Sequence, residues 1–295
     1  MLEPVFDVQA TLRRFAPEVR LHPDDPHRPS SVSWYLDRTR LRRRRGLFQR
    51  DVDVIADGRL NPESLARASS VDLGDPTNLY LDILSGSNRR NTRRGFRPVA
   101  GLLSAPCYVN ARSVEVRASA VFDLQYWFFY PYNGSEGRHV THQGDWEHIT
   151  VRVTNTGEPQ LVSAYVSAHG LNNGGWALPG DYRSSLRVNS TGNPIIYSAL
   201  GSHASYTSPG IHKQTWPKAG DRTVDGGPIW NTGDDLVLVE MNGQRPTQDE
   251  KSHQWLEFQG TWGVVRRFAW PFTSTGPIGP SHQSSWTGEP DQRKR

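Results

Sequence analysis

The sequence predicts an all-β protein, an antiparallel β-sandwich with short peripheral helices in its N-terminal part. From about Leu79 onward the chain consists of short runs of β-branched and aromatic residues, most of them bounded by Gly, Pro, Asn or Asp. No long helical segments separate these runs, which favours antiparallel sheets over βαβ units. Ten Trp, ten Tyr and ten Phe, with 27 Gly and 21 Pro, are typical of many short strands joined by tight turns.

The expected helices come before the expected strands. Apolar residues between positions 5 and 15 have a weak helical spacing. Ser30 or Ser31 is a suitable cap for a second short helix, which runs toward an arginine-rich stretch. Asn61, followed by Pro62 at the first helical position, marks the start of a third helix.

The expected strands follow in order along the chain. They are LYLDIL (79–84), VEVRASAVFDLQYWFFYPYNG (114–134), DWEHITVRV (145–153), QLVSAYVSAHG (160–170), PIIYSALGSHASY (194–206), DDLVLVE (234–240) and GVVRRFAW (263–270). We expect one sandwich domain over residues 1–288, in which residues 1 to about 78 form a helical and loop segment. The last residues, 289–295, are expected to be a disordered tail.

Two arginine-rich runs carry the positive charge. The formal net charge is +4, and the runs are RTRLRRRRG at 38–46 and RRNTRRG at 89–95. No aromatic residues alternate with these arginines, as they do in proteins that bind single strands, so nucleic acid is not expected as a partner. A solvated helix face plus a loop is one interpretation of the runs, and peripheral contact with an anionic membrane is the other.

The sequence also bears on the cellular compartment. The N-terminus lacks a basic segment followed by an apolar run, and nowhere do 18 apolar residues follow one another. We therefore expect a cytoplasmic protein, with secretion by a non-standard route as the alternative. The single cysteine, Cys107, excludes an intramolecular disulfide and a zinc cluster of thiolates.

The stretch HQGDWEHITVRV, at 142–153, brings two carboxylates to the start of an expected strand. Strand side chains alternate between faces, so Asp145 and Glu147 share the face of the apolar residues that follow. Ionised carboxylates there cost several kcal/mol each unless they are paired, protonated or bound to a cation. His142 precedes them across Gly144, which permits a bend that swings the imidazole toward the same point. This set of one nitrogen and two hard oxygens predicts a site for Mg, Ca or Mn.

Two further histidines end strand-like runs in a similar way. His169 closes VSAYVSAHG and His203 closes SALGSHASY, each with a glycine close by. If these runs are neighbours in one sheet, their ends gather at one rim, and both histidines are candidate acid/base residues. The alternative for each is a hydrogen-bonding residue at a strand end. Asn133, at the tip of YWFFYPYNG, is a further candidate metal ligand, and Tyr132 and Trp146 are candidates for contacting the bound ligand.

Six segments occur in a recognisable order between Phe15 and Thr287. They are FAPEVRLHPDDPHRPSSVSWYL, DLQYWFFYPYNG, HQGDWEHITVRV, SALGSHASY, WLEFQGTWG and GPIGPSHQSSWT. In this order they resemble the vacuolar protein sorting-associated protein 62 family, and GDWEH with the later GSHA makes the resemblance specific. The family name implies a role in sorting in fungi and leaves the molecular activity open.

The segment around GDWEH also resembles, more distantly, the necrosis- and ethylene-inducing-peptide-like proteins. These carry a GHRHDWE heptapeptide, a nearby turn that ends in Asp, and a later SAHG. The resemblance implies a β-sandwich whose rim holds a divalent cation and, in that group, recognises sphingolipid sugar head groups of plant membranes. Carried over, it places metal ligands at His142, Asp145 and Glu147, the turn ligand at Asn133 and the SAHG histidine at His169.

One function is expected, and two alternatives stay open. We expect a module that binds a polyhydroxylated small molecule, a glycan or a lipid head group with the help of a divalent cation. The first alternative is a metal-dependent enzyme of small-molecule metabolism, in which His169 or His203 moves a proton. The second is a structural site in which the carboxylates pair with arginine and hold no metal. No GxSxG elbow, P-loop or HExxH motif points to a particular enzyme class.

Overall fold

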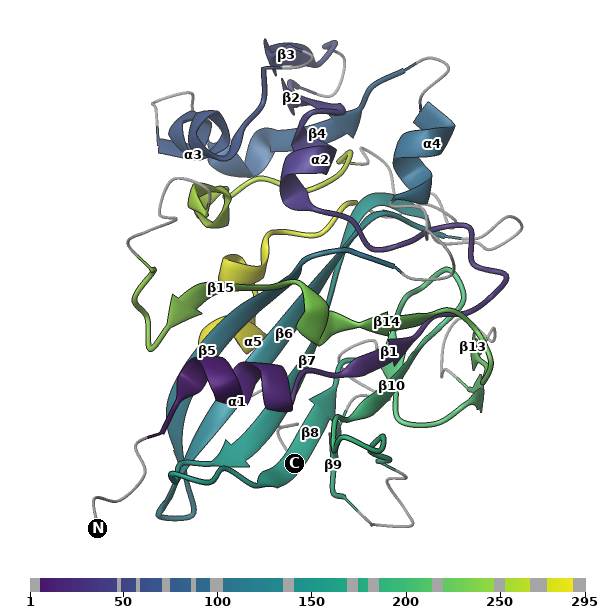
Figure 1. Cartoon of the computed structure of the whole chain (residues 1–295). Coiled ribbons are helices and arrows are strands. Elements are labelled where there is room, and N and C mark those ends of the chain that lie inside the picture. Colours follow the sequence, from purple (N-terminus) through teal and green to yellow (C-terminus); the bar gives the residue numbers. More distant parts are fainter. Residues whose placement is uncertain are drawn as a thin grey trace.

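The computed structural model describes residues 6–46, 49–56, 59–70, 75–85, 89–95, 103–134, 141–168, 175–179, 186–213, 220–246, 253–265 and 275–288. Among these residues, a six-stranded sheet runs through the centre of the molecule (Figure 1). Its strands lie in the order β15 (Leu236–Met241), β5 (Cys107–Val116), β6 (Ser119–Asn133), β7 (His142–Thr154), β8 (Leu161–Val166) and β9 (Gly175–Ala177). Neighbouring strands are antiparallel, except that β15 runs parallel to β5.

A tight hairpin joins β5 and β6. Residues 114–134, expected as one strand, are divided between β5 and β6 by a turn at Arg117 and Ala118. Both turn residues have positive φ, 49° and 62°. Two-residue hairpin turns with this conformation usually contain Gly or Asn, so the residues Arg117 and Ala118 do not predict the turn.

One face of the six-stranded sheet is covered by a smaller sheet. In order, the smaller sheet contains β11 (Ser205–Tyr206), β10 (Ile195–Ser198), β1 (Glu18–Arg20) and β14 (Ile229–Asn231), with β1 and β10 parallel. The helix α1 (Val8–Arg14) lies beside it, and β12 (Gly210–His212) pairs with β13 (Asp221–Thr223) nearby. Val19 and Trp230 from this layer share a hydrophobic core with Phe128 and Val151 of the central sheet. These two packed sheets are the predicted sandwich.

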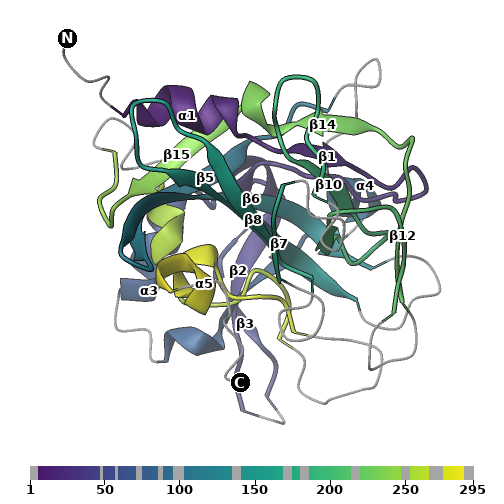
Figure 2. The same ribbon diagram turned by 90° about the horizontal axis from the view of Figure 1, so that it is seen from below.

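The opposite face of the central sheet is also covered, as Figure 2 shows from below. The covering elements are β3 (Val52–Ile55), β2 (Thr39–Arg43), β4 (Leu79–Ile83), α2 (Val32–Leu36), α3 (Pro62–Ser70), α4 (Arg89–Arg94), α5 (Ser284–Thr287) and the 3-10 turns η1 (Pro76–Asn78), η4 (Gln254–Glu257) and η5 (Pro280–His282). A further 3-10 turn, η2 (Thr232–Asp234), belongs to the first face, where Thr232 donates a hydrogen bond to the Pro17 carbonyl. A second core, rich in tryptophan, fills the opposite face and includes Trp127, Trp146 and Trp262.

The all-β class and the short peripheral helices are therefore confirmed. Ser31 caps α2 by accepting a hydrogen bond from the Trp34 amide, and Asn61 caps α3 through the Ser64 amide. The first arginine run differs from the expected helix face, because it lies on β2. There Arg40 and Arg42 pair with acidic residues, Asp53 and Asp82, of the neighbouring strands.

Both faces of β7 are buried because of this two-sided cover. Ile149, Val151 and Val153 face the first core, while Trp146 faces the second. Of the expected last strand, residues 263–265 are not a strand, and residues 266–270 lie outside the described residues, as does the tail at 289–295. No helix in the described ranges is long and apolar enough to cross a membrane.

Candidate functional site

The predicted carboxylates lie where β6 ends and β7 begins. The register of this antiparallel pair sets Asp145 opposite Tyr130 and His142 opposite Asn133. Opposed residues of a strand pair project to the same side of the sheet. Tyr130 and Asn133, at the end of β6, therefore lie beside Asp145 and His142. The strand pairing therefore sets these residues at one end of the sheet, and a bend is needed to bring His142 and Asp145 to the same face.

Gly144 sets the direction of the side chains before it. Its φ is +62°, and a Cβ on this residue would lie 2.2 Å from the carbonyl oxygen of Trp262. This bend lets the His142 ring turn back, with Nδ1 donating a hydrogen bond to the Gly144 carbonyl at 2.6 Å. Nε2 of His142 then lies 3.9 Å from Oδ1 of Asp145. The predicted approach of His142 to Asp145 across the glycine is thus present.

The second oxygen of Asp145 is held by two polar side chains. Oδ2 accepts hydrogen bonds from Nδ2 of Asn133 at 3.1 Å and from Nδ1 of His203 at 2.9 Å. Asn133 also donates to the carbonyl of Ser202, beside His203. The structure therefore brings Asn133, His142, Asp145 and His203 together, although β10, the strand before His203, belongs to the smaller sheet and is not a neighbour of β7 as expected.

His203 is enclosed on all sides. Its side chain is 1% exposed, and its ring is stacked on Tyr130 with centroids 3.8 Å apart. Nε2 points toward Asp25, 3.6 Å from Oδ2, and forms no hydrogen bond with the described residues. The backbone has a φ of 57°, a left-handed conformation that non-glycine residues rarely adopt. His203 thus lies between two carboxylates and does not face solvent.

Asp25 was not among the predicted site residues. It accepts the amide of Gly201 at 2.6 Å and the amide of His27 at 2.9 Å, so it fixes the loop that presents His203. His27 in turn donates Nδ1 to the carbonyl of Arg93, and burial, followed by the charge of His203, lowers its pKa. The only sequence signal was the density of His and Asp in HPDDPH, at 22–27.

The carboxyl group of Glu147 is electrostatically perturbed. Burial, followed by the negative charge of Asp145, raises the pKa of the Glu147 carboxyl well above its usual range, and the charge of Asp221 adds to this. The only hydrogen bond to this carboxylate from the described residues comes from Oγ of Ser167, at 3.1 Å from Oε2. An acid in such surroundings is either protonated or in need of a positive partner.

A cavity of about 350 Å³ lies near this carboxylate. It is lined by Val166, Tyr206, Thr207, Ser208, His212 and Lys213. Val166 precedes Ser167, the partner of Glu147, and the Tyr206 hydroxyl donates to Asp221, whose other oxygen accepts from Ser202. The cavity therefore lies beside the acidic rim and offers mostly polar lining groups.

The remaining predicted site residues have different positions. Trp146 is 5% exposed in the second core, on the other face of β7 from Asp145, where it stacks on Trp255 at 5.3 Å. Tyr132 is partly exposed, with the Arg93 guanidinium 4.4 Å from its ring centroid. His169 lies outside the described residues. Of the two predicted ligand-contacting aromatics, Tyr132 alone lies at the rim.

The donor set for a metal is incomplete within the described residues. No three of their His, Cys, Asp and Glu side chains are close enough together to hold an ion. One pair does fit. His142 donates its Nδ1 proton to a backbone carbonyl, the usual arrangement of a histidine that binds metal through Nε2. That Nε2 and Oδ1 of Asp145 are 3.9 Å apart, and no described side chain lies between them as a hydrogen-bond partner.

Comparison with known proteins identifies the family. A model of the family described as vacuolar protein sorting-associated protein 62 matches residues 3–268. The chain belongs to the vacuolar protein sorting-associated protein 62 family. This confirms the resemblance seen in the six sequence segments.

Two family relatives come from Saccharomyces cerevisiae. The vacuolar protein sorting-associated protein 62 of this yeast is 34% identical over 197 residues, which cover 54% of this chain and 40% of that protein. The putative vacuolar protein sorting-associated protein TDA6 is 31% identical over 169 residues, which cover 48% of this chain and 35% of that protein. The alignment thus spans less than half the length of either yeast relative.

Several solved structures, among them NLP proteins, align with this chain at low similarity. NLPPya in complex with glucosamine aligns over 92% of this chain and 85% of its own, with 15% identity and a TM-score of 0.38. The non-toxic HaNLP3 protein aligns over 99% and 96%, with 13% identity and a TM-score of 0.40. Necrosis and Ethylene inducing Protein 2, from the causal agent of cocoa's witches' broom disease, aligns over 97% and 92%, with 16% identity and a TM-score of 0.40. At TM-scores this low, the alignments support no conclusion about ligand or activity.

Proposed function

We propose that this member of the vacuolar protein sorting-associated protein 62 family binds a polar ligand through a divalent cation, Mg²⁺, Ca²⁺ or Mn²⁺, at the rim where β6 ends and β7 begins. The observation that carries the proposal is the approach of His142 to Asp145. Because Nδ1 of His142 donates its proton, Nε2 of the neutral ring carries a lone pair, and that lone pair lies 3.9 Å from a carboxylate oxygen. Ligand atoms that share an ion at about 2.1–2.4 Å lie roughly 3–4.5 Å apart, so this separation suits a shared ion.

The surplus of negative charge supports the same proposal. Asp145 and Glu147 form no ion pair with Arg or Lys in the described part of the chain. The structural alternative required a guanidinium between these carboxylates. Burial, followed by repulsion from Asp145, raises the pKa of Glu147, and a divalent cation would offset that repulsion. Glu147 would supply a further oxygen ligand after a change of its side-chain rotamer. Asn133, whose amide faces Asp145, lies close enough to contribute its own oxygen after a rotation of the amide.

The neighbouring cavity supports a polar ligand. Its hydroxyl, imidazole and ammonium groups, from Thr207, Ser208, His212 and Lys213, suit a hydroxylated molecule such as a sugar or a polar head group. Because His203 is buried between Asp25 and Asp145, we assign it a positioning role: it holds one oxygen of Asp145 and leaves the other for the ion. This arrangement favours binding over acid/base chemistry at His203.

Calorimetric titration of the protein, first stripped of metal by a chelator and dialysed, tests the proposal. Wild type should bind at least one of the three ions, and Asp145→Asn and Glu147→Gln should lose that binding. Glu158→Gln is the matched control, because Glu158 is exposed beyond the other end of β7. Sugars and head-group analogues are then titrated with and without the ion. Equal binding of the ions by wild type and Asp145→Asn would refute the cation site. Equal affinity for the sugars and head-group analogues with and without the ion would refute a role of the ion in ligand recognition.

A further inference from the structure

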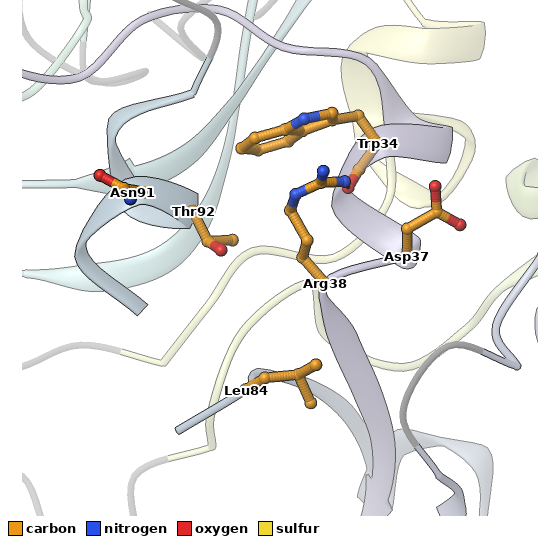
Figure 3. A pocket seen from close by; sticks show the side chains of 6 residues that line it. All are labelled: Trp34, Asp37, Arg38, Leu84, Asn91 and Thr92. Carbon is orange, nitrogen blue, oxygen red and sulfur yellow. The ribbon is translucent and has the colours of Figure 1, made fainter. Parts of the chain in front are cut away.

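The two arginine runs, far apart in the sequence, meet at a second cavity. This cavity has a volume of about 520 Å³ and lies between the end of α2, the start of β2 and α4. Its lining residues are Trp34, Asp37, Arg38, Leu84, Asn91 and Thr92, shown in Figure 3. Arg38 belongs to the first run, and Asn91 and Thr92 belong to the second. The volume is within the range of small-molecule sites.

Arg38 is held in place over an apolar surface. Its guanidinium carbon lies 4.3 Å from the centroid of the Trp34 ring, and Nη1 donates to the Trp34 carbonyl at 3.0 Å. Figure 3 shows the guanidinium stacked along the indole, with the Thr92 side chain directed toward this pair from α4 and Leu84 below. Arg38, which directly precedes β2, forms no ion pair with a described carboxylate, unlike Arg40 and Arg42 on that strand. A fixed guanidinium with donors to spare therefore lies next to indole and leucine carbons.

The surroundings of the cavity are strongly positive. The helix α4 has the sequence RRNTRR and contains no acidic residue. Arg89, Arg90 and Arg94 are exposed, and none of the three forms an ion pair with the described residues. Among the described lining residues, Asp37 is the only acidic one; its side chain is exposed, and Figure 3 shows it pointing away from the guanidinium. Such a field favours a dianion over a monoanion.

We propose that this cavity binds a phosphate monoester attached to an apolar or aromatic body. A phosphate monoester carries close to two negative charges at neutral pH and accepts paired hydrogen bonds from a guanidinium, here that of Arg38. Trp34 and Leu84 would contact the apolar body. The same chemistry occurs in a soluble phosphorylated metabolite and in a lipid with a phosphate head group. The proposal is independent of the cation site.

Calorimetry on protein stripped of divalent cations tests the proposal, because a phosphate held by an ion at Asp145 is then excluded. Phenyl phosphate should bind about tenfold more tightly than inorganic phosphate, since its ring is buried against Trp34, and phenol should not bind measurably. Arg38→Gln should weaken phenyl phosphate at least tenfold, whereas Arg67→Gln, the same change on α3, should leave the affinity unchanged. Equal affinity in wild type and Arg38→Gln would overturn the proposal.

Two exposed positions supply a test that does not depend on Arg38 itself. Asp37→Asn removes the acidic lining group and should strengthen phenyl phosphate binding about two- to fivefold, and Asn91→Asp should weaken it by a similar factor. Flotation with phosphatidylcholine vesicles, with and without phosphatidic acid, separates the two sources. Binding of the vesicles but not of phenyl phosphate, lost in Arg38→Gln, identifies the lipid source, and the reverse identifies a soluble one. Binding to neither probe overturns the proposal.

Discussion

Nδ1 of His203 lies 2.9 Å from Oδ2 of Asp145, while Nε2 of the same ring lies 3.6 Å from Oδ2 of Asp25. One buried imidazole thus joins the carboxylate at the start of β7 to a loop residue near the N-terminus. The relationship fixes which oxygen of Asp145 remains for another partner. It also makes the rim dependent on contacts between segments that are distant in the sequence.

A double-mutant cycle measures this bridge. His203→Asn keeps a residue that tolerates positive φ but removes the ring, and we expect it to lower the free energy of unfolding by about 1–3 kcal/mol at pH 7. Asp25→Asn should also destabilise. Because both variants break one network, their combined cost in urea unfolding should fall short of the sum by at least about 0.5 kcal/mol. Strict additivity would show that Asp25 and His203 act separately.

Gly144→Ala should destabilise the protein and displace the start of β7. An alanine there meets the Trp262 carbonyl at 2.2 Å and also adopts a φ of +62°. We expect a loss of about 2–4 kcal/mol in urea unfolding. Gly243→Ala is the matched control, because Gly243 has a φ of +77° with nothing within 4 Å of the added carbon. A similar loss in both variants would mean that the contact with Trp262 contributes nothing.

Asn133→Asp should have opposite effects on stability and on metal affinity. The change replaces the Nδ2 donor to Asp145 by a second carboxylate, so the metal-free protein should lose about 1–3 kcal/mol. The added negative charge should tighten the binding of Ca²⁺ or Mg²⁺, measured by calorimetry. Equal or weaker ion binding would exclude Asn133 from the neighbourhood of the ion.

His148 predicts a specific pH dependence. Its ring is stacked on Trp127 at 4.3 Å, and burial lowers its pKa from 6.5 to about 4. The unfolded state therefore binds a proton at a higher pH than the folded state. Stability from this residue is fully present above about pH 6.5 and is lost as the pH falls toward 4, by about 3 kcal/mol in all.

Urea unfolding of metal-free protein at pH 7, 5.5 and 4 checks this prediction against His148→Phe, which keeps a ring for Trp127 but does not titrate. The stability of wild type relative to the variant should fall as the pH falls. A difference between the two proteins that stays constant over this range would assign the acid sensitivity to other groups.

The local features of the site could be predicted because they depend on strand alternation. Asp145 and Glu147 lie on the face of Ile149 and Val151, and Gly144 makes the predicted bend, since a period of two and a glycine are both visible in the sequence. The tertiary features could not. Asp25 reaches the rim through a contact with Gly201, 176 residues away, and nothing local indicates that contact.

The second covered face of the sheet was also outside the reach of local pattern. Trp146 follows Asp145 in the sequence and was therefore expected at the rim. Strand alternation instead directs its side chain to the other face, into a tryptophan-rich core that forms only when the N- and C-terminal segments pack there. The arginines of β2 lie on a strand, although their sequence has no strand signal, because β3 and β4 supply both the ladder partners and the acidic side chains.

The most direct test of the cation site is thermal unfolding of wild type and Glu147→Gln at pH 7, each with chelator and with added Mg²⁺, Ca²⁺ or Mn²⁺. The pKa of Glu147 is raised, so the ionised carboxylate costs stability above its ordinary pKa, and without metal the variant should melt higher than wild type. An ion at ~100 times its dissociation constant should then stabilise wild type by about 2.7 kcal/mol, and the variant much less. No rise in the melting temperature of wild type with any of the three ions would contradict the account.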